Sequence, residues 1–423
     1  MPHDTSPGAS PGASPDVSPG GRPPLLSVAE ARARVLALIA ATGTEEVALE
    51  AAHGRILAAD VVATRAQPPF AASAMDGYAV RAAEAVAGAT LAVAGEIAAG
   101  HGPDRPLPAG AAMRLFTGAP LPEGADTVLI QENARREGAH VTVIEPPAAG
   151  LYVRPAGGDF APGGRIAAPC RLTPRHVALA AAMGAPRLTV ARRPVVALVP
   201  TGDELVAPGA TPRPDQIFAS NNYGLAARIE AAGAIPRLCA IAPDTREGLL
   251  AAFEEASGAD IVVTLGGASV GDHDLVARVF GEAGLELGFH RIAMRPGKPL
   301  MAGRIGARVT MLGLPGNPVS AMVCGELFLV PAIERAMGLP GDPPRRHRLP
   351  LAHPVEANGP REHYMRARLV EGTAVEVAVE VEVAGNQDSS LLSVLAGADV
   401  LVVRAPRAEA LPAGATVEVI ALP

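Results

Sequence analysis

The sequence of 423 residues has no tryptophan, and its aromatic content is only 3%. Hydrophobic residues nevertheless make up 49% of the chain, and many of them are alanine. The hydrophobic cores must therefore be built from aliphatic side chains. At this length the chain exceeds one ordinary domain, and we expect about three domains.

Cysteine is also scarce. The three cysteines, Cys170, Cys239 and Cys324, lie far apart and form neither a CxxC pair nor a zinc-ligand spacing. Each has apolar neighbours in the sequence, which favours a buried free thiol. The pattern predicts a protein of a reducing, cytoplasmic compartment.

Targeting and membrane signals are missing as well. The first residues have neither a basic start nor an apolar h-region, so we expect no signal peptide. No uninterrupted apolar run reaches the roughly 18–20 residues needed to cross a bilayer. The formal net charge of −7 argues against a nucleic-acid-binding surface, which is normally basic. We therefore expect a soluble protein with neither a nucleic-acid nor a membrane partner.

Several common catalytic motifs are absent too. The chain has no GxxxxGK followed by serine or threonine, no GxGxxG after a strand, no HExxH and no GxSxG. These absences argue against a P-loop ATPase and against nicotinamide binding.

Lysine occurs only once, as Lys298, whereas the other 35 of the 36 basic residues are arginine. Because the chain uses arginine almost everywhere, the retained lysine indicates a site that needs a compact point charge rather than a planar guanidinium. Chance survival at a solvated turn is the alternative, since most cations are surface residues. The surrounding Arg-Pro-Gly-Lys-Pro stretch (295–299) predicts a stiff turn that carries the ammonium group.

Composition changes along the chain divide it into five parts. Residues 1–23 repeat Ser-Pro-Gly-Ala-Ser and have almost no apolar residue larger than alanine, which predicts disorder. A capping box of Ser27 and Glu30 starts a predicted helix at 28–41. A second helix is predicted at 173–183, with Thr173 as its cap and Pro174 in first position.

Short β-like runs at about 60–160 predict a β-rich insertion between these helices. Strands that alternate with helices from 194 onward predict a mostly parallel, three-layer α/β domain. We therefore predict a multidomain α/β protein. Its parts are a disordered tail (1–23), a discontinuous supporting helical domain (24–62 and 164–192), a β-rich insertion domain (63–163), an α/β domain (193–340) and a small, β-barrel-like C-terminal domain (345–423).

The stretch 260–320 has the pattern of an anion-binding site. A β-branched run at 261–265 ends in Gly266 and Gly267, and a second run at 309–314 ends in a Pro-Gly-Asn-Pro turn before a helix. Parallel sheets bind ligands beyond the carboxyl ends of their strands. Glycines there let backbone N–H groups approach a phosphate. We expect Gly266, Gly267 and Ser269 to bind substrate at this edge.

Carboxylates cluster near the same strand ends. They are Asp203, Glu204, Asp244, Asp272 and Asp274, with Asp215 in a nearby loop. Mg²⁺ prefers one or two carboxylates together with substrate phosphate oxygens, so this pattern predicts a Mg²⁺ site. Arg291, Arg295 and Lys298 supply the opposing charge. The combination favours phosphoryl or nucleotidyl chemistry, in which catalysis is mostly positioning and charge neutralisation.

Other polar stretches allow two interpretations. Asp76 at an Asp-Gly turn, Thr117 at the start of a rigid loop and Asp159 after two glycines could all serve a site, but such residues are also ordinary turn chemistry. The basic run at 361–368 could close over an anion or form a solvated face. The polar stretch at 386–390 is similarly open.

Six motifs occur in a fixed order, and they are SAMDGYAV (73–80), FTGAPLPEGADTVLIQE (116–132), PTGDEL (200–205), GGASVGDHD (266–274), RPGKP (295–299) and GLPGNPVSA (313–321). Together they resemble the molybdopterin molybdenumtransferase (MoeA) family, which includes the C-terminal enzymatic domain of gephyrin. The resemblance covers roughly residues 25–423. It implies a four-part protomer with an α/β domain of the molybdopterin-binding type and an elongated homodimer.

The resemblance also implies the last step of molybdenum cofactor synthesis. In that step adenylylated molybdopterin and molybdate give molybdenum cofactor and AMP, with Mg²⁺ or another divalent ion. The residues that match the family's active site are Asp76, Thr117, Asp159, Glu204, Asp244, Asp274, Lys298, Pro315, Pro318, Ser320, Arg366 and Ser389.

Physical roles can be assigned to these matches. Molybdate is a tetrahedral dianion, so Lys298, the Ser320 hydroxyl, Arg366 and the N–H groups of the helix after the Pro-Gly-Asn-Pro turn could hold it. Mg²⁺ on Asp274, with Asp244 as the further ligand, would polarise the phosphoanhydride. Asp76 and Thr117 come from another domain and could complete the cleft from a partner chain.

Three stretches depart from the family pattern. Ala71 and Ala72 stand where the family usually has Asp-Asn, Ala219 stands where Asp is common, and Asp388 replaces a usual glycine. Asp388 adds a negative charge close to Ser389.

Three other functions stay open from the sequence. They are the related adenylyltransferase that prepares the substrate, a non-catalytic gephyrin-like scaffold, and insertion of tungsten in place of molybdenum. As protein partners, the adenylyltransferase and the enzymes that accept the cofactor are possible.

Overall fold

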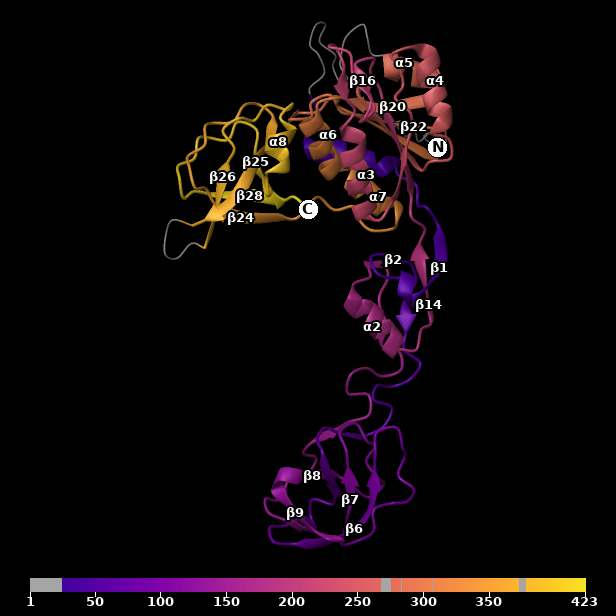
Figure 1. The fold of residues 1–423 in the computed structure, drawn as a ribbon, viewed down its shortest axis with the longest axis vertical. Helices are drawn as coiled ribbons and strands as arrows, with labels where there is room; N and C mark the ends of the chain where they lie inside the picture. Colours follow the sequence, from indigo (N-terminus) through magenta and orange to yellow (C-terminus); the bar gives the residue numbers. More distant parts are fainter. Residues whose placement is uncertain (1–24, 268–274, 283, 307, 373–377) are drawn as a thin grey trace, which may run out of the picture. The chain divides into compact units, whose positions relative to one another are not determined.

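The computed structural model describes residues 25–267, 275–282, 284–306, 308–372 and 378–423. It contains two compact units (Figure 1). The first, called the α/β unit below, consists of residues 25–41, 194–336 and 340–423, and the second, called the β unit, consists of residues 42–193 and 337–339. The tail expected at 1–23 and the candidate residues Ser269 and Asp274 lie outside the described residues.

The α/β unit is built on a six-stranded sheet with the order β18-β15-β19-β23-β22-β20. Its strands are β15 (Val195–Pro200), β18 (Ile235–Leu238), β19 (Ile261–Leu265), β20 (Leu285–His290), β22 (Met301–Ile305) and β23 (Val309–Leu314). The strands from β18 to β23 pair in parallel, whereas β22 and β20 pair antiparallel. Every residue of β19 is buried, as expected for a central strand covered on both faces.

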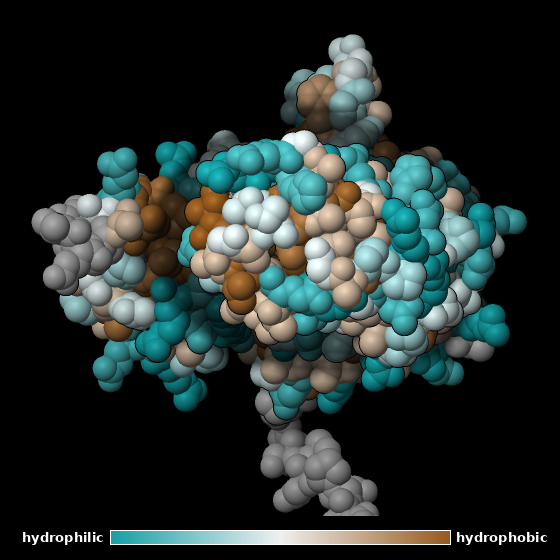
Figure 2. Space-filling view, turned by 90° about the horizontal axis from the view of Figure 1, so that it is seen from below, coloured by the Kyte–Doolittle hydropathy of each residue, from teal (hydrophilic) through white to brown (hydrophobic). Residues whose placement is uncertain are grey.

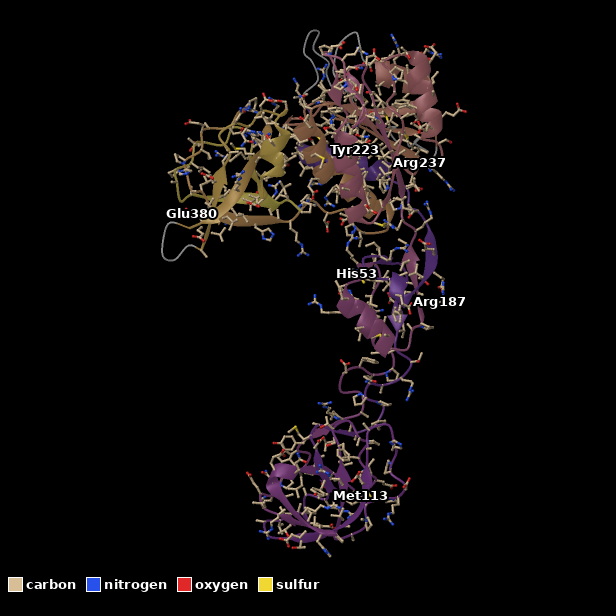
Figure 3. The ribbon with its side chains drawn as sticks, in the orientation of Figure 1. His53, Met113, Arg187, Tyr223, Arg237 and Glu380 are labelled. Carbon is tan, nitrogen blue, oxygen red and sulfur yellow. The ribbon has the colours of Figure 1, made fainter. Side chains whose placement is uncertain are left out.

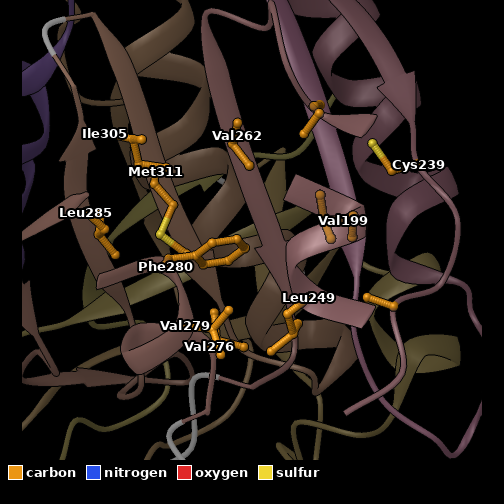
Figure 4. Close-up of a cluster of buried hydrophobic side chains, with 14 of the residues drawn as sticks. Val199, Cys239, Leu249, Val262, Val276, Val279, Phe280, Leu285, Ile305 and Met311 are labelled. Carbon is orange, nitrogen blue, oxygen red and sulfur yellow. The ribbon is translucent and has the colours of Figure 1, made fainter. Parts of the chain in front are cut away.

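Helices pack on this sheet. They are α1 (Val28–Leu38), α3 (Asn221–Ala232), α4 (Arg246–Glu255), α5 (Leu275–Glu282), α6 (Pro318–Cys324) and α7 (Val330–Ala336), with a π-helical segment (Gly325–Leu329) between the last two. Leu249 of α4 and Phe280 of α5 join one buried cluster with Val262 and Met311 of the sheet (Figure 4). Helix α3 packs on β15 and β18 and contacts α6 and α7. The core is aliphatic, as the composition predicts.

The strand order creates a switch point at the carboxyl edge of the sheet. Strand β15 is followed by the short β16–β17 ribbon (Leu205–Val206 and Ile217–Phe218), then by α3 and by β18 on one side. Strand β19 lies on the other side of β15, and the chain beyond it continues to α5 and to β20 at the far edge. The connections after β15 and β19 therefore diverge, which opens the crevice where α/β sheets bind ligands.

The C-terminal part of the α/β unit is a curled sheet. Its strands are β21 (Met294–Arg295), β24 (Arg346–Pro350), β25 (Glu362–Glu371), β26 (Val379–Val383), β27 (Val400–Arg404) and β28 (Thr416–Ala421), with helix α8 (Leu392–Ala396). The first of these strands, β21, pairs in parallel with β25 and so ties the C-terminal sheet to the rest of the unit. Leu351, just after β24, bridges Val381 of β26. This bridge turns the sheet toward the predicted barrel-like form.

The β unit contains two larger sheets and two short ribbons. One sheet has the order β1-β14-β2-β13 and carries α2 (Pro174–Ala182); its strands are Thr44–Ala48, Arg187–Ala191, Ile56–Leu57 and Cys170–Arg171. The other has the order β8-β5-β7-β6-β10-β9; its strands are Thr127–Ile130, Gly77–Val80, Ala111–Leu115, Thr90–Ile97, His140–Val143 and Ala134–Glu137. The ribbons pair β4 (Ala72–Ser73) with β11 (Val153–Arg154) and β3 (Val61–Val62) with β12 (Arg165–Ile166), and single 3-10 turns lie at Leu49–Ala51 and Gln131–Asn133. Met113 of β7, labelled in Figure 3, lies in the core of the larger sheet.

The structure groups the first helix differently from the sequence-based division. The capping box of Ser27 and Glu30 is confirmed, and α1 ends at Leu38. This helix belongs to the α/β unit: the Leu26 carbonyl accepts a hydrogen bond from the Ala293 N–H at 2.7 Å, and the Leu38 carbonyl accepts one from the Thr310 hydroxyl at 3.0 Å. The remaining supporting part is a four-stranded sheet with one helix, α2, which begins at Thr173 and Pro174 as predicted. Local capping signals define where a helix begins, but not which sheet its apolar face covers.

The molecular surface fits a chain whose apolar residues are mostly inside. On the face shown in Figure 2, hydrophilic and intermediate residues surround smaller apolar areas. Single exposed apolar residues are normal on protein surfaces. Among the described helices, none combines the length and the hydrophobicity required to span a membrane.

Candidate active site

A cleft with a volume of about 540 Å³ lies at the carboxyl edge of the α/β sheet. Its walls come from the segments after β15, β18, β19 and β23, which the switch point brings together. Six of the sequence-predicted site residues line it, namely Glu204, Asp244, Gly266, Gly267, Pro315 and Pro318. The cleft lies beyond the ends of the parallel strands, and these six residues meet there.

Glycine is required at the turn that follows β19. Gly266 has φ +106°, and a Cβ there would lie 2.6 Å from the Thr201 carbonyl oxygen. Gly267 has φ +63°, and a Cβ there would lie 2.3 Å from a methyl group of Val276. A Cβ added at Gly316 would lie 3.6 Å from the Cα of Gly266. Two glycine-containing turns thus approach each other with backbone alone, which leaves room for a ligand phosphate.

Three carboxylates gather at one end of the cleft. The backbone N–H of Asp244 donates to Asp203 Oδ1 at 3.2 Å, and Gly202 allows the Glu204 carboxylate to fold against the backbone, because a Cβ at 202 would lie 2.2 Å from Glu204 Oε2. Burial, followed by the negative charges of Asp203 and Glu204, raises the pKa of Asp244. Within the described ranges, no group of three or more potential ligands is arranged to hold a metal ion by itself.

An apolar wall faces these polar groups. Ile217 and Phe218 of the β16–β17 ribbon both line the cleft, although 61% and 47% of their surfaces are exposed. Large exposed apolar side chains beside glycine turns and carboxylates suit a ligand with a flat ring and a charged end.

The turn with the single lysine lies beside the cleft. Pro299, next to Lys298, lines it, and Lys298 itself is exposed. The turn rests on α6, since Gly297 has φ +105° and a Cβ there would lie 2.6 Å from Cys324 Sγ. Arg295 is exposed on β21, and Arg291 is half-buried with its N–H donating to the Leu300 carbonyl.

The loop between β26 and α8 brings the predicted residue Ser389 to the start of α6. The Ser389 hydroxyl accepts a hydrogen bond from Asn317 Nδ2 at 3.2 Å, and the Ser389 carbonyl accepts one from the Val319 N–H at 3.1 Å. Ser389 thus lies against the Pro-Gly-Asn-Pro turn, and Ser320 is buried just beyond it. Because Pro318 has no N–H and the Val319 N–H already has a partner, two positions at this helix start are not available to an oxyanion, contrary to the sequence-based expectation.

Arg366 is fully buried behind the same loop. Its Nη2 donates to the carbonyls of Asn386 and Asp388, both at 3.1 Å. Its Nε and Nη1 have no partner among the described residues. Two bonds from Ser390 lower the pKa of Asp388, so the extra carboxylate noted in the sequence is satisfied within its own loop. A buried guanidinium with two unused nitrogens is costly unless an anion completes it.

The β unit holds the remaining predicted residues. Asp76 Oδ1 accepts hydrogen bonds from the Thr117 N–H at 2.7 Å and from the Thr117 hydroxyl at 2.8 Å. These two bonds, backbone first, lower the pKa of Asp76, and the charge of Arg114 adds to the effect. Asp159 lines a separate cavity of about 620 Å³. The structure therefore brings Asp76 and Thr117 into direct contact.

Three comparisons with known proteins agree on one family. Family models match residues 26–184 (MoeA N-terminal region, domains I and II), 197–335 (probable molybdopterin binding domain) and 348–422 (MoeA C-terminal region, domain IV). A molybdopterin molybdenumtransferase of Nostoc sp. is 40% identical over 305 residues, which cover 70% of each chain. A molybdopterin molybdenumtransferase 1 of Mycobacterium tuberculosis is 32% identical over 419 residues, 93% of this chain and 98% of the relative. The chain belongs to the molybdopterin molybdenumtransferase (MoeA) family.

A solved structure extends the MoeA likeness to the whole fold. The molybdopterin biosynthesis MoeA protein of Pyrococcus horikoshii matches with a TM-score of 0.80 and 32% identity, covering 94% of this chain and 99% of that one. The multidomain α/β architecture predicted from the sequence is thereby confirmed. In this MoeA chain the three family models fall on the β unit with α1, on the α/β sheet and on the C-terminal sheet.

Some residues of this MoeA chain escaped sequence reasoning. Arg154 and Gln67 line the same cavity as Asp159, and the guanidinium of Arg114 lies beside Asp76. Nothing local distinguishes them, because Arg154 is one of 35 arginines and Gln67 lies ninety-odd positions from Asp159 in the sequence. Phe218 was equally missed, although a large apolar residue at the end of a short strand beside a loop could have drawn attention to it.

Proposed function

We propose that this chain inserts molybdenum from molybdate into adenylylated molybdopterin and releases AMP, the final step of molybdenum cofactor biosynthesis. The observation that carries the proposal is the cleft of the α/β unit, where two glycine-containing turns face a group of carboxylates. Such turns suit phosphate groups, and such carboxylates suit a divalent cation that binds with them. Membership of the MoeA family supports the substrate class, since its relatives carry the name of this transferase.

The cleft would bind the nucleotide end of the substrate. Gly266 and Gly267 would approach the phosphoanhydride, and Pro315 and Pro318 would shape the opposite wall. We assign Ser269 to the same substrate from the sequence pattern. The wall formed by Ile217 and Phe218 offers a flat ring an apolar surface. The flat ring would thus lie in the apolar part of the cleft, and the phosphates would lie in its glycine-lined part.

Cationic groups beside the cleft would bind molybdate. We assign this role to Lys298 and Arg366, with the hydroxyls of Ser320 and Ser389 and with Arg291 and Arg295 as further charges. The buried, incompletely bonded guanidinium of Arg366 supports the assignment most directly. A tetrahedral dianion would satisfy its free nitrogens and remove the cost of leaving them buried without partners.

We propose Mg²⁺ as the metal, with Asp244 and Asp274 as its protein ligands. The fit rests on the chemistry of the donors: Asp244 lies among other negative charges that raise its pKa, and a cation would relieve this repulsion. Two carboxylates are enough for Mg²⁺, which keeps several waters and shares substrate phosphate oxygens. When bound, the ion would stabilise negative charge on the phosphoanhydride oxygens. Glu204 would orient water or substrate from the same group.

We further propose that the enzyme is a cytoplasmic homodimer and that Asp76, Thr117 and Asp159 serve the reaction in it. The three cysteines are free, in keeping with a reducing compartment. Asp76→Ala and Lys298→Ala chains, each expected to be less active than wild type, can be mixed and allowed to exchange subunits. Restored AMP release in the mixture would support a site shared between partner chains, whereas no restoration would argue against it.

AMP release is the test of the main proposal. Purified protein is incubated with adenylylated molybdopterin and Mg²⁺, with and without molybdate, beside Lys298→Ala. The matched control is Arg308→Ala, which removes an exposed cation at the opposite, amino end of β23. We expect molybdate-dependent AMP release that falls about 100-fold in Lys298→Ala and stays unchanged in the control.

Three other results would change the conclusion. Adenylylation of molybdopterin when ATP is supplied, without AMP release from the adenylylated substrate, would identify the related adenylyltransferase. No turnover in either assay would favour a non-catalytic scaffold. Equal activity with tungstate and molybdate would extend the substrate to both oxyanions.

A further inference from the structure

The strand ends next to Asp76 and Thr117 meet at the same end of the strands in the six-stranded sheet of the β unit. Strand β5 begins at Gly77, directly after Asp76, and its first residue pairs with Leu115 of β7 and with Ile130 of β8. Strand β7 ends at Leu115, two residues before Thr117, and β8 ends at Ile130. The antiparallel register therefore places three separate segments at the same end of the strands.

Arg114 reaches across all three of these segments. It lies opposite Tyr78 in the register of β5 and β7. Its guanidinium carbon lies 5.2 Å from the ring centroid of Tyr78 and 5.1 Å from that of Phe116. Its Nη1 donates to the Gly77 carbonyl at 3.3 Å, and its Nη2 donates to Gln131 Oε1 at 2.8 Å.

These contacts fall on the neighbours of the site residues. Gly77 follows Asp76, Phe116 precedes Thr117, and the Gln131 N–H donates to the Asp76 carbonyl at 3.1 Å. Gly77 leaves no room for a side chain, because a Cβ there would lie 2.2 Å from the Leu129 carbonyl oxygen. Arg114 thus fixes the backbone on both sides of the hydrogen-bonded Asp76–Thr117 pair.

The partners that hold the Arg114 side chain do not neutralise its positive charge. Its hydrogen-bond donors meet the Gly77 carbonyl and the Gln131 amide oxygen, both neutral. The rings on which it lies favour a cation without neutralising it. Asp76 is the carboxylate whose pKa its charge lowers. A cation held by neutral partners beside one carboxylate is arranged to act on that carboxylate.

We infer that Arg114 is a positioning residue of the transferase, which holds the segments on both sides of the Asp76–Thr117 pair and so keeps the pair aligned for the reaction. The inference rests on the proposed function and names a residue of that same site. Arg114 does not touch the reacting groups in this role. It acts through Gly77 and Phe116 on the backbone and through its charge on Asp76.

The test compares three variants. Arg114→Gln keeps a polar side chain but removes the charge, and Arg114→Lys keeps the charge but loses the planar fork that bonds two partners at once. The matched control is Arg135→Gln, which removes an exposed arginine from β9 at the far edge of the same sheet. We expect kcat for molybdate-dependent AMP release to fall about tenfold in Arg114→Gln and to stay unchanged in the control. We expect the KM for adenylylated molybdopterin to change less than twofold in both Arg114→Gln and Arg135→Gln.

A second measurement separates positioning from simple stability and does not need turnover. The carboxyl ¹³C resonance of Asp76, assigned by its loss in Asp76→Asn, is titrated in each variant. We expect its midpoint to move to higher pH in Arg114→Gln, and to stay near the wild-type value in Arg114→Lys and in Arg135→Gln.

The outcomes of the two measurements are distinguishable. If the wild-type protein releases no AMP, the proposed function fails, and the titration still decides whether Arg114 acts on Asp76. An Asp76 midpoint that is the same in Arg114→Gln and Arg135→Gln would overturn the inference. So would a wild-type kcat in Arg114→Gln, or a loss of kcat accompanied by an equal loss of folded protein.

Discussion

Asp244 in the α/β unit and Asp76 in the β unit are the same residue type with opposite pKa shifts. Asp244 has burial and two like charges around it, and its pKa is raised. Asp76 accepts two hydrogen bonds from Thr117 and lies near Arg114, and its pKa is lowered. The groups that raise the pKa of the first carboxylate are negative, whereas the second carboxylate is already satisfied by hydrogen-bond donors. The two regions therefore suit different tasks: Asp244 can gain a cation, and Asp76 can act as a fixed acceptor.

The two frameworks explain the difference. Asp244 follows a parallel strand at a switch point, where several loops converge and carry their acids into one crevice. Asp76 precedes an antiparallel strand whose two neighbours end beside it, so donors from those strands can reach it. Loops that converge on one crevice bring carboxylates close together, whereas paired strand ends bring hydrogen-bond donors to a carboxylate.

Replacing Asp244 should have the largest effect on activity and should also stabilise the fold. In Asp244→Asn we expect molybdate-dependent AMP release to fall about 100-fold, because a metal ligand is lost. We expect the melting temperature at pH 7 to rise, because the repulsion with Asp203 and Glu204 is relieved. Because the folded-state pKa of Asp244 is raised, its destabilising charge disappears as pH falls through that value. The difference in melting temperature should therefore shrink toward acid pH.

Calorimetry and the AMP assay on one preparation measure both effects. The control is Asp342→Asn, an exposed aspartate in the linker before the C-terminal sheet of the same unit. A lower melting temperature in Asp244→Asn would contradict the view that this carboxylate is held at a cost to stability.

Replacing Asp76 should give the opposite change in stability. In Asp76→Asn we expect AMP release to fall about tenfold and the melting temperature at pH 7 to fall, since Thr117 loses a charged acceptor. A group with a lowered folded-state pKa stabilises the fold above its unfolded pKa of about 3.9. This stabilisation is lost as pH falls through the lower folded value. The wild-type and variant melting curves should therefore converge only below about pH 4.

Asp104→Asn, an exposed change in the same unit, is the control for Asp76. If both Asp76→Asn and Asp244→Asn shift the melting temperature in the same direction, the contrast between the two carboxylates is wrong.

Local signals in the sequence predicted the helices and strands well, and they also predicted two of the turns that line the cleft. Gly266 and Gly267 after β19 have positive φ angles and close contacts that leave no room for a side chain. The two glycines in the sequence were therefore enough to predict a turn there. The end of β23 was found in the same way, from its Pro-Gly-Asn-Pro turn. The domain of α1 was not, because its partners Ala293 and Thr310 lie more than 250 positions away in the sequence.

Side-chain pairs across a sheet were the least predictable features of the site. Thr117 meets Asp76 only because β5 and β7 pair with Gly77 opposite Leu115. A register shift of one residue would turn Arg114 to the other face of the sheet. The sequence indicates which segments are strands, but the register that creates this site depends on the packing of the whole sheet.

Changing the apolar wall of the cleft should have the smallest effect and should sharpen the contrast with the Asp76 region, where the rings of Tyr78 and Phe116 lie against the guanidinium of Arg114. In Phe218→Ala we expect the KM for adenylylated molybdopterin to rise about fivefold, the effect of roughly 1 kcal/mol of lost ring stacking. We expect kcat and the melting temperature to stay near wild type, because 47% of the Phe218 surface is exposed and little core packing is lost. Ile235→Ala, which truncates an exposed residue of β18 that does not line the cleft, is the matched control. A fall in kcat without a change in KM would place Phe218 with the reacting groups instead, and an unchanged KM would leave the glycine turns and the charged residues as the whole of the binding site.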